Sequence, residues 1–300
     1  MPLLTQICAS AFVSLTTKPP VHGMSDRKAM ARWEKRTPGI TAWVDSLRND
    51  GILKDTMFDL NGLKLRAFYA AAPKPSEKTA VIVHGFFVNP MAVMMLARMY
   101  RDEFGYNVWL PEQRRHGESE GDAIQFGWAE KYDVLEWSRI AHEHLNDSIQ
   151  VLHGMSMGAA SVMMASGEST PSYVRGFIED CGYSSVWDEF SYVLKKNFHS
   201  KNDDFLLKAE RVNKERYGWD YHEASSLVQV AKCCKPMLFI HGGEDPLVPT
   251  EMARECFEAK KEGYRKLWIA PGSAHSWSFP DHSERYISEV RDFLKDHVEN

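Results

Sequence analysis

Ser156 lies between two glycines, Gly154 and Gly158, and follows directly on a short apolar run. The apolar run predicts a strand, and the small residues that come after Gly158 predict a helix. A G-x-S-x-G sequence between a strand and a helix is typical of a nucleophile elbow, a strained turn that lifts the serine hydroxyl out of a sheet. The start of the helix would offer free backbone N–H groups to a developing oxyanion. Ser156 is therefore the predicted nucleophile, with an ordinary tight turn as the alternative.

Two later segments present an acid and a base where apolar runs end. Asp245 follows the run 236–241 through a Gly-rich turn, and His275 follows the run 265–270 through a Pro-Gly turn. Functional residues of open parallel sheets gather at the carboxyl ends of the strands, so these side chains are expected to meet near the serine. A neutral imidazole can take the proton of a serine near neutral pH, and a carboxylate behind it fixes its tautomer. The predicted roles are base for His275 and orienting acid for Asp245.

Each of these two residues has an alternative interpretation. His275 could be an ordinary loop histidine, and Asp245 could be an aspartate that caps its own turn. Asp180 ends the apolar run 174–179 and could also reach the histidine. The sequence therefore leaves Asp180 open as the alternative acid.

Backbone amides that face the nucleophile are expected after another apolar run, 79–84. This run ends in His84 and is followed by Gly85 and Phe86. The N–H groups of Phe86 and of Met157, the residue after the serine, are the predicted oxyanion hole. We interpret His84 as a structural histidine that bonds nearby loop backbone.

With these motifs in place, the chain resembles an α/β-hydrolase, and more narrowly the bacterial serine hydrolases of the acyl-esterase, cinnamoyl-esterase-like and dipeptidyl-peptidase-like groups. The resemblance covers roughly residues 60–300. It implies an α/β-hydrolase fold and a serine hydrolase mechanism but identifies no substrate. In the loop after the fourth strand, Glu112 stands where the family usually has an aspartate. The matching segments are His84–Phe86, Leu110–Ser119, Gly154–Gly158, Phe177–Tyr183, His241–Asp245 and Gly272–His275.

From residue 55 the chain alternates short apolar runs with amphipathic stretches. This order predicts an α/β fold with a mostly parallel, doubly wound, eight-stranded sheet. The predicted strands are 55–60, 63–71, 79–84, 107–110, 148–153, 174–179, 236–241 and 265–270. The main predicted helices are 90–104, 126–145, 157–167, 250–260 and 283–298.

Two segments fall outside this alternation. Residues 1–54 are interpreted as an N-terminal helical extension of a hydrolase domain over 55–300. The segment at about 186–232 is interpreted as a helical cap inserted in that domain. An insertion at the carboxyl end of the sheet lies near the nucleophile, so the cap is expected to roof the pocket. The candidate wall residues in the cap are Trp187, Phe190 and Tyr192.

Composition limits the classes of function. A chain of 300 residues with 44% hydrophobic content can bury one large core, and a formal net charge of −5 with mixed signs gives no basic stripe for nucleic acid. The five cysteines have no metal-ligand spacing, so free thiols and no metal or other cofactor are expected. The apolar stretch Leu3–Leu15 is too short to span a bilayer. A cytoplasmic location is favoured over a cell-envelope protein whose anchor has been removed, and the oligomeric state is left open.

Together these features predict a serine hydrolase that cleaves a small-molecule carboxylic ester through an acyl-enzyme. A peptidase or amidase with the same triad is the first alternative, and a catalytically silent binding protein is the second. A peptidase that binds a free ammonium group needs a carboxylate pair in its pocket. The adjacent pair Asp188-Glu189 in the cap is a weak candidate because neighbouring helical residues point in different directions. A mainly uncharged acyl pocket is therefore expected.

Overall fold

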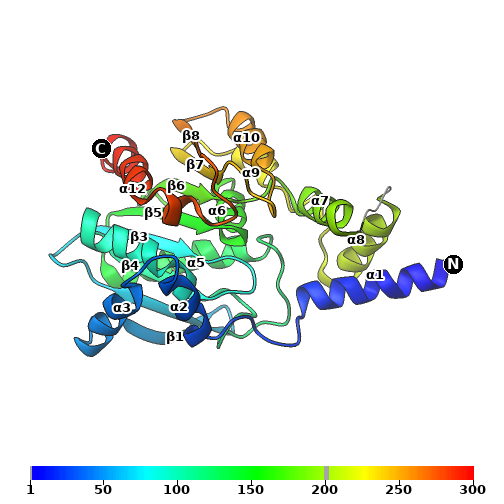
Figure 1. Cartoon of the computed structure of the whole chain (residues 1–300), viewed down its shortest axis with the longest axis horizontal. Coiled ribbons are helices and arrows are strands. Elements are labelled where there is room, and N and C mark those ends of the chain that lie inside the picture. The colour runs from blue at the N-terminus through cyan, green and yellow to red at the C-terminus, as the bar shows by residue number, and fades with distance from the viewer. Residues whose placement is uncertain (1, 199–202) are drawn as a thin grey trace.

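Eight strands form a single sheet in the computed structural model, which describes residues 2–198 and 203–300 (Figure 1). Their order across the sheet is β1-β2-β4-β3-β5-β6-β7-β8. β2 pairs antiparallel with β1 and with β4, and all other neighbours in this order are parallel. The predicted fold class is confirmed. The strands are Lys54–Leu60 (β1), Leu63–Ala70 (β2), Lys78–Val83 (β3), Asn107–Pro111 (β4), Ile149–Met155 (β5), Val174–Asp180 (β6), Met237–Gly242 (β7) and Arg265–Ala270 (β8).

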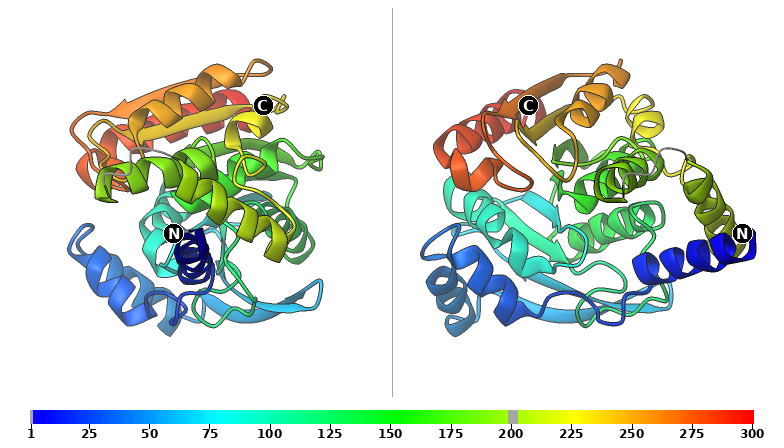
Figure 2. Two further views of the ribbon diagram at one scale, coloured as in Figure 1. Left: turned by 90° about the vertical axis from the view of Figure 1, so that its right-hand side faces the viewer. Right: turned by 45° about the vertical axis from the view of Figure 1, so that its right-hand side comes forward.

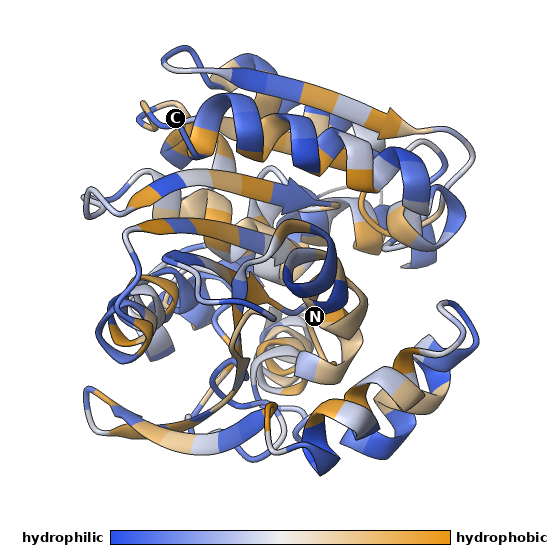
Figure 3. Ribbon diagram, turned by 90° about the vertical axis from the view of Figure 1, so that its left-hand side faces the viewer, coloured by the Kyte–Doolittle hydropathy of each residue, from blue (hydrophilic) through white to orange (hydrophobic). Residues whose placement is uncertain are grey.

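Helices cover both faces of this sheet, and Figure 3 shows hydrophobic stretches on the strands between helices of mixed character. The longer helices are Pro2–Thr17 (α1), Asp26–Glu34 (α2), Ile40–Asn49 (α3), Glu130–Leu145 (α5), Met157–Ser166 (α6), Val186–Phe198 (α7), Asp204–Tyr217 (α8), Thr250–Ala259 (α10) and Ser283–Phe293 (α12). Shorter pieces are Pro90–Val93 (η1), Met94–Arg98 (α4), Met99–Glu103 (η2), Ser226–Val230 (α9), Ser278–Asp281 (α11) and Leu294–Val298 (η3). The single helix predicted over 90–104 is therefore divided into three short pieces.

Side chains of the central strands alternate between two hydrophobic cores, because successive strand residues point to opposite faces. In β3, Ala80 and Ile82 enter the core under α2, α3, α4 and α12. Val81 and Val83 enter the core under α5, α6, α9 and α10. Cover on both faces explains why the strands read as continuous apolar runs.

The cap helices α7 and α8 project from one side of the molecule, and α1 lies beside α8, away from α2 and α3 (Figures 1 and 2). The ring of Phe12 meets the rings of Phe190 and Phe205 edge to face, with centroids 5.4 and 5.6 Å apart. Thr17 Oγ1 and the Tyr217 hydroxyl are hydrogen-bonded at 3.0 Å. The cap and α1 thus share a third hydrophobic core, which also includes one face of α6. Among the described helices, none has the length and apolar character needed to cross a membrane.

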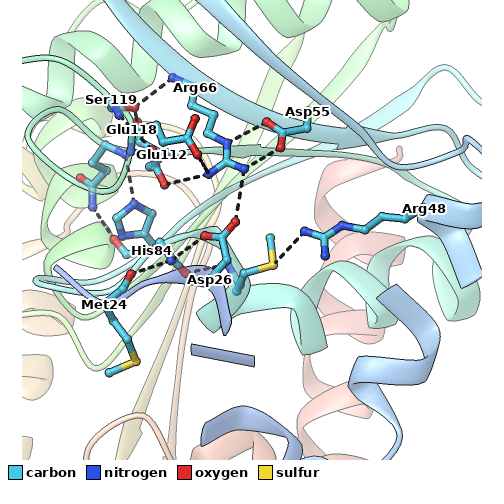
Figure 4. A network of polar contacts seen from close by, with 12 residues as sticks. Met24, Asp26, Arg48, Asp55, Arg66, His84, Glu112, Glu118 and Ser119 are labelled. Atoms are coloured by element: carbon cyan, nitrogen blue, oxygen red, sulfur yellow. Dashed lines mark hydrogen bonds and ion pairs between the residues drawn. The ribbon is translucent and has the colours of Figure 1, made fainter. Parts of the chain in front are cut away.

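A cluster of charged side chains fastens the start of α2 to the sheet (Figure 4). The Arg66 guanidinium of β2 lies 3.2 Å from a carboxylate oxygen of Asp26, 2.5 Å from Asp55, 3.8 Å from Glu112 and 3.4 Å from Glu118. The side chain of Arg66 is 8% exposed and that of Glu112 is fully buried. Burial raises the pKa of Glu112 to about 7, although Arg66 and two backbone N–H groups favour its charge. α2 is therefore held against β2 by a guanidinium shared among several carboxylates.

Candidate active site

Ser156 occupies a strained turn between β5 and α6. Its backbone φ of 59° and ψ of −122° lie in a region that residues with side chains rarely adopt. A Cβ on Gly154 would lie 2.1 Å from the Gly158 carbonyl oxygen, and a Cβ on Gly158 would lie 2.2 Å from the Val83 carbonyl oxygen. Because neither contact is tolerable, both glycines are required by close backbone approach around the serine.

The structure brings the three predicted side chains into one hydrogen-bonded line. Ser156 Oγ lies 2.8 Å from His275 Nε2, and His275 Nδ1 lies 2.7 Å from Asp245 Oδ2. Asp245 follows β7 and His275 follows β8, and the two loops nearly touch, since a Cβ on Gly242 would lie 2.4 Å from the Ser273 carbonyl oxygen. This arrangement can accept the serine proton at Nε2 while Nδ1–H donates to the carboxylate.

Asp245 is held in its ionised form by donors on both oxygens. Its Oδ1 accepts the backbone N–H groups of Leu247 at 2.8 Å and Val248 at 3.0 Å. Its Oδ2 also lies 3.4 Å from Nε2 of the buried His241. Burial opposes the charge of Asp245, but the hydrogen bonds to His241 and His275 lower its pKa well below the ordinary value. The carboxylate therefore stays charged and fixed in orientation near neutral pH.

Asp180, the alternative acid, lies in a different hydrogen-bond chain. Its Oδ2 accepts the Tyr286 hydroxyl at 3.0 Å, and that hydroxyl also lies 3.1 Å from His153 Nε2. Burial raises the pKa of Asp180 to about 6. The geometry favours Asp245 over Asp180, since it is Asp245 that bonds His275.

The predicted oxyanion amides lie on either side of the serine. Met157 is the first residue of α6, where the backbone N–H has no partner within the helix. On the other side, a Cβ on Gly85 would lie 3.0 Å from Ser156 Cβ, so the chain leading to Phe86 passes directly beside the serine. His84 Nε2 accepts the backbone N–H of Gln113 at 3.0 Å, which matches its interpretation as a structural histidine.

A cavity of about 200 Å³ opens in front of the serine. The N-terminal segment provides part of its wall, whereas the cap was expected to roof the pocket. Trp187, Phe190 and Tyr192 do not line this cavity. No local motif marks the three N-terminal wall residues, and their place follows from how α2 packs. The cavity is lined by Arg32, Trp33, Arg36, Gly85, Phe86, Val88, Met155, Ser156, Leu247, His275 and Ser276.

The cap contacts the loop that carries Asp245. The Tyr192 hydroxyl donates to the Pro246 carbonyl oxygen at 3.3 Å, and Lys196 Nζ donates to the same oxygen. Burial and the charge of Asp245 raise the pKa of Glu189 to about 8, and one of its oxygens is buried without a hydrogen bond. The neighbouring Asp188 bonds the hydroxyls of two serines near the start of α7. The two adjacent carboxylates of the cap are therefore used separately.

Two groups of side chains in the described part of the chain could present three metal ligands. One consists of Cys181, Asp245 and His275, of which the last two already bond each other. The other consists of Glu210, Asp220 and His222 on the cap. His222 Nδ1 bonds a Glu210 oxygen at 2.6 Å, and Lys214 pairs with Asp220 at 2.6 Å. In both groups the candidate ligand atoms already serve hydrogen bonds or ion pairs.

A model described as the alpha/beta hydrolase family matches residues 80–289, which is well over half of the chain. The protein YqkD of Bacillus subtilis (strain 168) is 29% identical over 227 residues, which cover 75% of this chain and 74% of that protein.

Solved structures show the same fold at lower identity. The esterase Pf2001 of Pyrococcus furiosus superimposes with a TM-score of 0.68 at 21% identity, over 84% of this chain and 94% of that one. An acylaminoacyl peptidase of Pyrococcus horikoshii superimposes with a TM-score of 0.62 at 17% identity, over 85% of this chain and 43% of that one. At these identities the likeness establishes the fold and leaves the chemistry to the site.

Proposed function

This chain belongs to the α/β-hydrolase family, and from that premise we propose that it is a serine hydrolase that cleaves carboxylic esters. The nucleophile is Ser156, the base is His275 and the orienting acid is Asp245. The backbone N–H groups of Phe86 and Met157 form the oxyanion hole. The observation that carries the proposal is the continuous line of hydrogen bonds, 2.8 Å from Ser156 Oγ to His275 and 2.7 Å from His275 to Asp245.

The reaction follows from this line in two halves. Ser156 Oγ attacks the ester carbonyl carbon while its proton passes to His275 Nε2. The carbonyl oxygen becomes an oxyanion that accepts hydrogen bonds from the two backbone N–H groups. The tetrahedral intermediate then expels the alcohol, which takes the proton from Nε2, and the acyl group remains on Oγ. Water then attacks the acyl carbonyl carbon and gives a proton to His275 Nε2. The second tetrahedral intermediate releases the carboxylic acid, and Oγ takes back its proton from Nε2. Throughout, the Asp245 carboxylate accepts a hydrogen bond from His275 Nδ1–H and stabilises the imidazolium.

The cavity lining favours esters over peptides with a free amino terminus. Binding an ammonium group out of water requires a carboxylate partner, and the residues that line the described cavity include neither Asp nor Glu. Amides whose amino group is blocked are the second candidate, because the same triad can attack them and an acylaminoacyl peptidase shares the fold. A catalytically silent binding protein is disfavoured by a triad with intact hydrogen bonds.

Loss of the nucleophile tests the proposal most directly. The wild-type protein should react with a fluorophosphonate probe and hydrolyse short methylumbelliferyl esters faster than blocked or free aminoacyl anilides. Ser156→Ala should abolish labelling and lower ester hydrolysis by roughly three to six decades. Ser161→Ala is the matched control, because Ser161 lies on α6 with its hydroxyl bonded to the Met157 carbonyl oxygen. Full turnover by Ser156→Ala would refute the proposed mechanism.

A further inference from the structure

Arg32 and Arg36 place two positive charges in the wall of the cavity that contains Ser156 and His275. Arg32 lies in the last turn of α2 and Arg36 two residues past its end, where the Arg36 backbone N–H donates to the Trp33 carbonyl oxygen at 3.0 Å. Burial and the charge of Arg32 lower the pKa of Arg36 to about 10, which leaves Arg36 charged at neutral pH.

Neither guanidinium has an ion-pair or hydrogen-bond partner within residues 2–198 and 203–300. Two carboxylates, one close in sequence and one close in space, are engaged elsewhere. Glu34 accepts the backbone N–H groups of Gly39 at 2.7 Å and Thr41 at 2.8 Å. Asp281, which contributes to the field at Arg36, accepts the hydroxyl of Ser273 at 2.8 Å. Arg66, by contrast, is surrounded by four carboxylates in the cluster of Figure 4.

Arg36 is nevertheless fixed in position. Its guanidinium carbon lies 4.7 Å from the centre of the Trp33 ring and 4.2 Å from that of Trp277, which follows His275 in the same loop. Two indole faces hold the group by cation–π contact but leave its N–H donors without acceptors. A guanidinium presents its donors in a planar fork that suits the oxygens of a carboxylate or phosphate. The N–H donors of Arg36 are therefore free to bind an anion in the cavity that contains Ser156.

We propose that Arg32 and Arg36 bind an anionic group, a carboxylate or a phosphate, on the ester that Ser156 attacks. The inference rests on the proposed function and adds the substrate class. Val88, Met155 and Leu247 line the same cavity and would contact an apolar part of that ester. The cavity volume of about 200 Å³ is below the roughly 300–1,000 Å³ of sites for drug-sized ligands. The substrate is therefore a small ester with a short apolar body and one anionic end.

Matched esters test this assignment. Methylumbelliferyl valerate, hemiglutarate and phosphonobutyrate share a chain of similar length and differ in a terminal methyl, carboxylate or phosphonate. A second pair is phenyl valerate, which is neutral, and carboxyphenyl valerate, which carries the charge on the alcohol side of the ester. At least one anionic ester should exceed its neutral partner in kcat/KM by about tenfold, as a charge-assisted hydrogen bond provides. The better of carboxylate and phosphonate distinguishes the two anions.

Variants assign the preference to the two arginines. The double variant Arg32→Gln with Arg36→Met should lose the preference, because KM should rise more for the anionic ester than for the neutral one. Arg36→Lys should retain part of the preference. The double variant Arg27→Gln with Lys28→Met is the matched control, because both side chains are exposed on α2 outside the cavity of Ser156 and the variant also removes two positive charges.

A binding measurement separates this inference from the proposed function. Glutarate or inorganic phosphate should change the fluorescence of Trp33 and Trp277 in Ser156→Ala, and the double arginine variant should abolish the change. Hydrolysis by the wild type with equal kcat/KM for neutral and anionic esters would overturn the anion site and leave the esterase standing. Anion binding without labelling of Ser156 would support the site and overturn the esterase. Absence of both the fluorescence change and the preference would overturn the inference.

Discussion

The cap and the N-terminal segment both lie outside the alternation of strands and helices, yet they reach different parts of the site. The cap helix α7 contacts the Pro246 carbonyl oxygen beside Asp245 and carries the buried Glu189. The N-terminal helix α2 brings Arg32 and Trp33 into the cavity wall. The cap therefore contacts the loop of Asp245, and the N-terminal segment forms part of the cavity wall.

The difference shows what position along the chain can and cannot predict. The cap follows β6 and begins at the carboxyl edge of the sheet, so proximity to the serine was expected of it. The N-terminal segment precedes the whole sheet, and its position depends on contacts with distant residues. The Asp26–Arg66 pair and the hydrogen bond from Met24 N–H to the Phe87 carbonyl oxygen, 3.1 Å long, bring α2 to the cavity.

The largest expected effect concerns Asp245, whose loop the cap contacts. Asp245→Asn should lower kcat for ester hydrolysis by on the order of 10⁴, because the amide favours the wrong imidazole tautomer. Asp180→Asn should cost far less, since Asp180 bonds Tyr286 and not His275. Steady-state kinetics of both variants on methylumbelliferyl valerate decide between them. A larger loss in Asp180→Asn would exchange the two roles.

The sequence predicted the strands and the site much better than it predicted the cavity. The predicted strand bounds agree with the structure to within two residues at each end. For the central strands the signal is an apolar run, because strands covered on both faces lack polar positions, whereas the edge strand β1 is mostly exposed. Ser156, Asp245 and His275 each follow such a run within a few residues, so short-range patterns put them on the same edge. Their catalytic roles stay a prediction. Arg32 and Arg36 look like ordinary charged residues of a surface helix. Their place depends on the ion cluster and the Trp277 contact, which no local pattern records.

The second prediction breaks the anchor of the N-terminal segment. Arg66→Met should lower the free energy of unfolding by about 3 kcal/mol, because Glu112 would lose its guanidinium partner while fully buried. Arg139→Met is the matched control: its pairs with Glu136 and Glu143 are exposed and should be worth less than about 1 kcal/mol. Urea unfolding measures both. Equal losses would show that the cluster does not anchor α2.

The third prediction concerns the carboxyl group buried in the cap. The pKa of Glu189 is raised to about 8, so the folded chain holds this proton at pH values where the unfolded chain has released it. Stability from this group is therefore complete at acid pH and is lost as pH rises toward 8. Glu189→Gln removes the ionisation. Its free energy of unfolding relative to that of the wild type should therefore rise by about 2 kcal/mol when the pH is raised from 6 to 9. Urea unfolding at both values checks this.

Activity adds a control to the same variant. Glu189→Gln should leave ester hydrolysis within about twofold at pH 7, where the carboxyl is mostly protonated in the folded chain. If Glu189→Gln instead abolished cleavage of an aminoacyl anilide that the wild type cleaves faster than esters, Glu189 would be an ammonium anchor. The peptidase alternative would then replace the esterase.

The smallest expected effect compares the two regions directly. Trp33 of α2 lines the cavity and is 4% exposed. Phe190 of α7 is linked to the cavity through Phe126, whose ring stacks on that of Phe86 with centroids 5.7 Å apart. Trp33→Leu should therefore lower kcat/KM on methylumbelliferyl valerate by about tenfold through KM, because it removes an aromatic wall. Phe190→Leu should change it by less than about twofold, although both substitutions remove buried aromatic surface and lower stability.

Each variant is assayed below its unfolding temperature, which circular dichroism gives. A fall in kcat/KM then reflects weaker substrate binding in the cavity and not a smaller folded fraction. A larger rise in KM for Phe190→Leu than for Trp33→Leu would make the cap the substrate wall. The N-terminal segment would then be a structural support whose arginines face the cavity without touching substrate. The predicted order, Trp33 before Phe190, follows from geometry, because the wall of the cavity includes the α2 indole directly and reaches the cap ring through two intervening phenyl rings.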